Sequence, residues 1–64
     1  MSAQDTFEWS VAAIAKRHDA ETEAFIKTQR EYLYTLRSED ERQRFVEGVM
    51  QQLRVMEQQK KNRA

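Results

Sequence analysis

A helix start in the middle of the chain constrains the fold more than any other feature. Ser38 follows one helical pattern and precedes another, and Glu41 stands three residues later. At this spacing the serine oxygen can accept the backbone N–H of Glu41, while that carboxylate accepts the N–H of Ser38. Three acids, residues 39–41, then occupy the first turn, where the positive end of the helix dipole favours them. Two helices joined by a short turn at Ser38 are therefore predicted, which is an all-α helical hairpin.

The first predicted helix covers residues 5–37. Asp5, with Glu8 three residues later, is a suitable N-terminal cap. Apolar side chains then recur at steps of three and four, and no Gly or Pro interrupts them. The stripe consists of Phe7, Val11, Ile14, Phe25, Tyr32 and Leu36, with Ala15, Ile26 and Leu33 on its shoulder.

An alternative interpretation of the same segment divides it near Asp19. Residues 16–23 are polar, and Asp19 followed by Glu21 and Glu23 has the composition of a second helix start. A break there converts the hairpin into a three-helix bundle. Because the stripe keeps its phase across the segment and no Gly or Pro marks a break, the continuous helix is the preferred prediction.

The second predicted helix covers residues 39–60. Its apolar side chains spread over about 140° of the helix surface, which is more than one antiparallel neighbour covers. They are Phe45, Val46, Val49, Met50, Leu53 and Met56. Gly48 stands in the middle of this helix, where it costs about 1 kcal/mol relative to Ala. It marks either a close helix crossing or a tolerated surface position.

The hairpin is expected to form a homodimer. A single domain over residues 1–64 buries little apolar surface alone. The first helix would be about 50 Å long and the second about 33 Å, so the N-terminal part of the first would overhang. Two copies would then form a four-helix bundle. The predicted dimer core contains Ile14, His18, Phe25, Tyr32, Phe45, Val49, Leu53 and Met56.

Composition argues against several classes of function. The chain contains no Cys, which excludes disulfides and thiolate metal sites. Its 11 basic and 11 acidic residues cancel, so broad attraction to nucleic acid or to an anionic membrane is not expected. His18 and Glu21 form only half of a metal site. We therefore expect no enzyme activity, metal or cofactor, no membrane association, and a cytoplasmic location.

The expected function is that of a small protein-binding adaptor, regulator or subunit that acts as a helical homo-oligomer. The predicted partner-binding residues are Phe7, Trp9, Val11 and Tyr34. Trp9 points about 180° away from the apolar stripe, near the direction of Tyr34. A large exposed aromatic side chain is a suitable anchor for a partner, although it can also simply cover a dimer edge.

Two other interpretations remain open. The first is a nucleic-acid-binding regulator, because basic residues gather toward the end of the chain. The residues that would contact nucleic acid are Arg54, Lys60, Lys61 and Arg63. The second is a purely structural oligomer without an outside partner, in which substitution of Trp9 changes only assembly or nothing at all.

Overall fold

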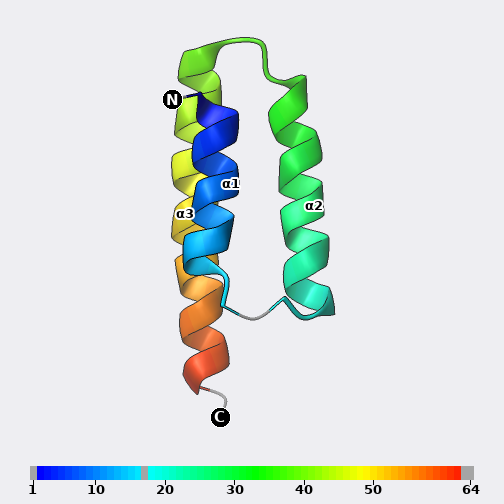
Figure 1. The fold of residues 1–64 in the computed structure, drawn as a ribbon, viewed down its shortest axis with the longest axis vertical. Coiled ribbons are helices and arrows are strands. Elements are labelled where there is room, and N and C mark those ends of the chain that lie inside the picture. The colour runs from blue at the N-terminus through cyan, green and yellow to red at the C-terminus, as the bar shows by residue number, and fades with distance from the viewer. Residues whose placement is uncertain (1, 17, 63–64) are drawn as a thin grey trace.

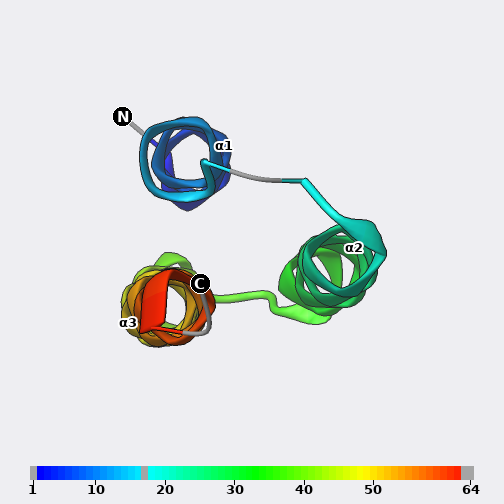
Figure 2. The same cartoon turned by 90° about the horizontal axis from the view of Figure 1, so that it is seen from below.

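Three α-helices make up the computed structural model, which describes residues 2–16 and 18–62 (Figure 1). Helix α1 spans Ala3–Ile14, α2 spans Ala20–Thr35 and α3 spans Glu39–Asn62. The helices α1 and α3 run in the same direction, and α2 runs antiparallel to both (Figure 1). Viewed along their axes, they form a triangle (Figure 2). The described chain is therefore an all-α three-helix bundle, the alternative that the sequence left open.

The predicted continuous helix over residues 5–37 is wrong, because the chain breaks before Asp19. Helix α1 ends at Ile14, and α2 begins at Ala20. Asp19 has an extended backbone, and its carboxylate accepts the N–H of Thr22 at 2.9 Å. This cap starts a new helix, with two acids in its first turn. The local capping signal thus outweighs the continuity of the apolar stripe.

The start of α1 is fixed by Ser2 and by a contact with α3. Ser2, and not Asp5, is the N-cap, and its Oγ accepts the N–H of Asp5 at 3.2 Å. Ala3 is fully buried, and its N–H donates to Oε1 of Glu39 at 2.8 Å. This hydrogen bond satisfies a donor that the first helical turn leaves without an intrahelical partner. It also aligns the N-terminal ends of α1 and α3.

The turn between α2 and α3 lies where the sequence predicts it. The backbone carbonyl of Ser38 accepts the N–H of Arg42 at 3.0 Å, so α3 begins at Glu39 as expected. Leu36 closes α2 by donating its N–H to the carbonyl of Leu33 at 3.2 Å. The Arg42 Nε donates in turn to the carbonyl of Leu36 at 2.8 Å. The Arg42 side chain therefore links the end of α2 to the first turn of α3.

The core lies inside the triangle, and α1 packs more extensively on α3 than on α2. Small side chains on α1 allow this close approach: Ala3 and Ser10 are both buried. The Ser10 hydroxyl donates to the carbonyl of Thr6 at 2.7 Å, so its burial leaves no unsatisfied donor. The buried apolar residues are Ala3, Phe7, Val11, Ala15, Ile26, Leu33, Val46, Val49 and Leu53.

Candidate functional site

A groove of about 360 Å³ lies between α2 and α3. Its lining residues are Phe25 and Gln29 from α2, and Arg44, Phe45, Gly48, Val49 and Gln52 from α3. Among these described residues, Arg44 alone is charged. The rings of Tyr32 and Phe45 meet across the two helices with centroids 4.8 Å apart and planes tilted by 39°. We call this feature the α2–α3 groove.

The periodicity of the sequence explains why this groove has few charges. On α3, uncharged residues recur at steps of three and four, as in a helix-packing seam. These residues are Phe45, Gly48, Gln52, Val55 and Gln59. On α2, Phe25, Gln29 and Tyr32 follow the same spacing. Although 34% of the chain is charged, these two stripes beside the groove carry no charge.

Gly48 lies in the groove without a structural need for glycine. A Cβ added to it would meet no described atom within 4 Å. It also does not adopt a positive φ, the conformation that favours glycine over other residues. A glycine in a helix interior costs about 1 kcal/mol relative to alanine. Its effect here is to leave the α3 backbone accessible to a partner helix or side chain that enters the groove.

The predicted dimer-core residues fall into three groups. Val49 and Leu53 are buried in this chain, Ile14, Phe25, Phe45 and Met56 are half-buried, and His18 and Tyr32 are exposed. The break at Asp19 explains the difference. After the break, the rotation of α2 about its own axis is no longer determined by that of α1. As a result Ile26 and Leu33, predicted for the shoulder of the stripe, face the core. Phe25 and Tyr32 are left at or beside the groove.

Two of the four predicted partner-binding residues are not accessible. Phe7 is 1% exposed and Val11 is 7% exposed, because α1 folds back onto α3 instead of overhanging. The expectation that they extend beyond the hairpin is therefore wrong. Trp9 is 64% exposed on α1. Tyr34 is also exposed, but it lies on α2, and its hydroxyl accepts from Nε2 of Gln4 at 2.8 Å.

His18 lies on the surface and not in a helix seam. Its Nδ1 contacts the carboxylate of Glu23, while Glu21 is exposed and is not part of this pair. No group of three or more metal-ligating side chains occurs among the described residues. His18 is therefore exposed in the single chain, and its place in a dimer core stays a prediction.

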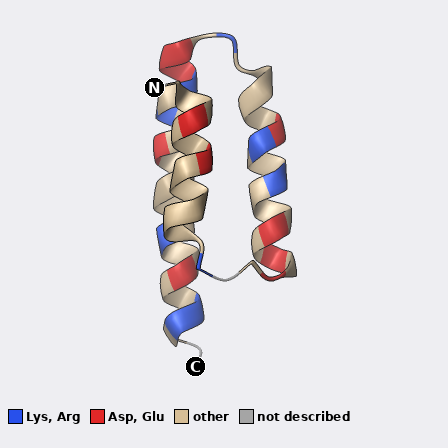
Figure 3. Cartoon of the chain, viewed as in Figure 1, with Lys and Arg blue, Asp and Glu red and all other residues tan. Residues whose placement is uncertain are grey.

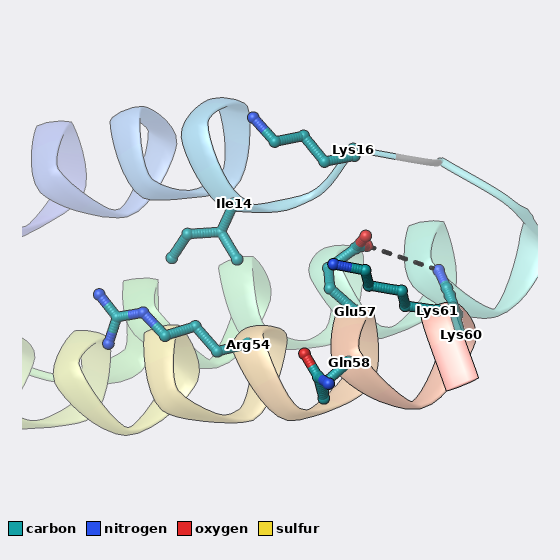
Figure 4. A pocket seen from close by; sticks show the side chains of 7 residues that line it. All are labelled: Ile14, Lys16, Arg54, Glu57, Gln58, Lys60 and Lys61. Atoms are coloured by element: carbon teal, nitrogen blue, oxygen red, sulfur yellow. Dashed lines mark ion pairs between the residues drawn. The ribbon is translucent and has the colours of Figure 1, made fainter.

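A second pocket, of about 430 Å³, lies where α1 ends beside the last turns of α3 (Figure 4). Its lining residues are Ile14, Lys16, Arg54, Glu57, Gln58, Lys60 and Lys61. It includes three of the four bases predicted for nucleic-acid contact, and Arg63 lies outside the described residues. The sequence gives no signal for Lys16, because a continuous first helix provides no reason to place it beside α3. We call this feature the basic pocket.

Within the basic pocket, Lys60 has a structural role. Its Nζ lies 3.2 Å from Oδ1 of Asp19 and 3.8 Å from Oε1 of Glu57, and it also contacts the Thr22 hydroxyl. The pKa of Asp19 is lowered, chiefly by the hydrogen bond from the Thr22 backbone N–H and with a contribution from Lys60. The Lys60 ammonium therefore connects the last turns of α3 to the cap of α2.

Charge is distributed unevenly along the helices. Figure 3 shows acidic residues at the start of α3 and basic residues at its end, as the helix dipole favours.

Comparison with protein-family models, curated proteins and solved structures found no match. None of the helices in the described residues has the length and apolar character needed to cross a membrane. The geometry of the two surface features is therefore the basis for proposing a function.

Proposed function

We propose that this chain is a small protein-binding adaptor, regulator or subunit, and that its docking surface is the α2–α3 groove. The observation that carries the proposal is the combination of half-buried aromatic rings with walls in which Arg44 is the one charged residue among the described lining. Phe25 and Phe45 lie in the groove and still expose part of their surface. Aromatic side chains dominate the energetics of many interfaces, whereas charged residues are depleted at interface centres.

The mechanism would be the docking of one helix between α2 and α3. Covering the exposed parts of Phe25 and Phe45 would remove apolar surface from water, at about 25 cal/mol per Å². Arg44 and Gln52 would supply hydrogen-bonding groups to the same helix. The same proposal includes that the protein does not catalyse a reaction, that it is located in the cytoplasm, and that it acts as a helical homo-oligomer.

Site-specific photo-crosslinking tests this proposal with two neighbouring glutamines. A benzophenone amino acid at Gln52 lies in the groove, whereas the same group at the exposed Gln51 points about 100° away around the helix. Irradiation in extract of the source cells is expected to give protein adducts from position 52 and few from position 51. Gly48→Glu should remove the adducts from position 52. Equal yields at both positions, or none at position 52, would contradict the proposal.

A second candidate function is nucleic-acid binding at the basic pocket. Figure 4 shows Ile14 between the side chains of Lys16 and Arg54, with Lys61 farther along α3 beside Glu57. Bases from two segments of the chain therefore gather in one place. Against this, Glu57 lines the same pocket, and the C-terminal ends of α1 and α3 bring negative dipole ends toward it.

Salt dependence tests the second candidate. Binding of a fluorescent single-stranded oligonucleotide by phosphate contacts should weaken steeply as salt rises from about 50 to about 200 mM. The double substitution Arg54→Ala and Lys61→Ala should weaken it further. Arg37→Ala, at an exposed base in the turn between α2 and α3, is the matched control. Absence of binding at low salt would exclude this function.

A further inference from the structure

We infer that the occupant of the α2–α3 groove is a second copy of this chain, with the two α3 helices crossing antiparallel at Gly48. The inference rests on the proposed function and names the partner of the same groove. In this arrangement α3 of each copy lies in the groove of the other. The α2 and α3 helices of both copies then form a four-helix bundle, and each α1 remains on the outside.

The charge pattern of the groove suits a surface that faces itself. In a two-fold symmetric contact the same patch is used on both copies. A cluster of like charges on one copy would therefore face the same cluster on the other copy and repel it. The stripe on α3 carries no charge from Phe45 to Gln59, and the stripe on α2 carries none from Phe25 to Tyr32. A strongly charged foreign helix would instead call for several groups of opposite charge. Among the described lining residues only Arg44 is charged.

The position of Gly48 indicates where the symmetry axis passes. On a two-fold axis a residue faces its own counterpart, so a small residue there permits the closest approach of two helices. Gly48 lies within the uncharged stripe of α3, with Phe45 one turn before it and Gln52 one turn after it. The space around its Cα is open in the single chain. A second α3 would occupy this space and give a reason for the glycine.

The antiparallel crossing also determines which residues meet. Residues at equal distances before and after Gly48 face each other, so Arg44 of one copy faces Gln52 of the other. The guanidinium can donate to the amide oxygen, and the single lining charge thereby gains a polar partner. Within one chain these two residues are about 12 Å apart along the helix, which is too far for direct contact.

Solution mass across a concentration series is the main test. The wild type is expected to show twice its chain mass of 7.7 kDa and to dissociate on dilution. Gly48→Glu should raise the dimer dissociation constant at least tenfold while far-UV circular dichroism stays helical. Gln51→Glu introduces the same charge on another side of α3 and should remain dimeric. A wild type that is monomeric at every concentration, or two variants with equal effects, would overturn the inference.

Charge exchange between copies tests the register. Gln52→Lys should weaken self-association, because it places a second cation opposite Arg44. Mixing it with an Arg44→Glu chain should restore dimers, since the introduced lysine of one chain then faces the introduced glutamate of the other. Rescue that requires the mixture supports the antiparallel crossing, and no rescue overturns it.

The crosslinked products separate this inference from the proposed function. An adduct from position 52 with twice the chain mass supports the second copy. Adducts with other chains only, together with a monomeric wild type, overturn the second copy and leave the groove as a docking surface. Absence of adducts from position 52 contradicts both.

Discussion

The guanidinium of Arg30 on α2 binds the carboxylate of Glu8 on α1 through two hydrogen bonds of 2.8 Å each. The same guanidinium lies 5.7 Å from the centroid of the Phe7 ring. The side-chain hydrogen bond lowers the pKa of Glu8 and raises that of Arg30. Because α1 and α2 share little other packing, this pair is a main link between them.

Arg30→Ala is expected to lower the free energy of unfolding by roughly 0.5–1 kcal/mol. Both partners are more than one-third exposed, so water screens the pair and limits its contribution. Arg30→Lys should recover only part of the loss, since lysine cannot form the bidentate contact. Urea denaturation followed by circular dichroism measures the effect. Lys27→Ala, at an exposed position of the same helix, is the control, and an equal loss there would refute the assignment.

Phe7→Ala is expected to cost roughly 3–5 kcal/mol of stability, as for other buried aromatic residues. For a domain of this size such a loss should leave the chain largely unfolded. Trp9→Ala, two residues away and 64% exposed, should change stability by less than about 0.5 kcal/mol. Thermal unfolding of the two variants checks the packing of α1. Retention of a stable fold by Phe7→Ala would mean that α1 does not pack as described.

Gly48→Ala is expected to stabilise the isolated chain by about 1 kcal/mol, because alanine favours the helix and its Cβ meets no described atom within 4 Å. The same substitution should weaken docking in the α2–α3 groove. Urea denaturation of dilute protein gives the first effect, and concentration-dependent mass gives the second. The expected result is a rise in the stability of dilute protein together with weaker docking in the groove. A fall in the stability of dilute protein would mean that Gly48 is needed within its own chain.

Acid should destabilise the fold through Glu8 and Asp19. Both groups have folded pKa values below their ordinary values of 4.5 and 3.8. Their contribution is present above those ordinary values and is lost as the pH falls through the lower folded values. The urea midpoint should therefore drop below about pH 4.5. The variant with Glu8→Gln and Asp19→Asn should be less stable at pH 7 and should show a smaller drop. An unchanged drop would mean that groups other than Glu8 and Asp19 cause the acid sensitivity.

Local signals in the sequence predict much of the helical structure. The helix start after Ser38 is found at Glu39 with three acids in its first turn, because first-turn charge depends only on neighbouring residues. Asp19 carries an equally local signal, and it starts α2. Continuity of the apolar stripe is the weaker predictor here, because the stripe crosses a polar segment in which His18 is exposed.

The faces of the helices and the groove depend on tertiary packing. Ile26 and Leu33 each lie one residue from the predicted core positions Phe25 and Tyr32, so a rotation of α2 about its axis decides which of the two pairs is buried. The path of the chain after α1 decides that rotation. The sequence marks Gly48 as unusual, but its place in a groove follows only from the position of α2 beside α3.

The parallel pairing of α1 with α3 has a consequence for how the chain folds. The most extensively packed pair joins the first and last helices, so its contacts require closure of a loop that contains the whole of α2. Folding is slower when the main contacts are distant in sequence. During synthesis, the apolar face of α1 that contains Phe7 lacks its main packing surface until α3 has been translated. This face of α1 therefore stays without its main packing surface while the residues of α2 and the first turns of α3 are added.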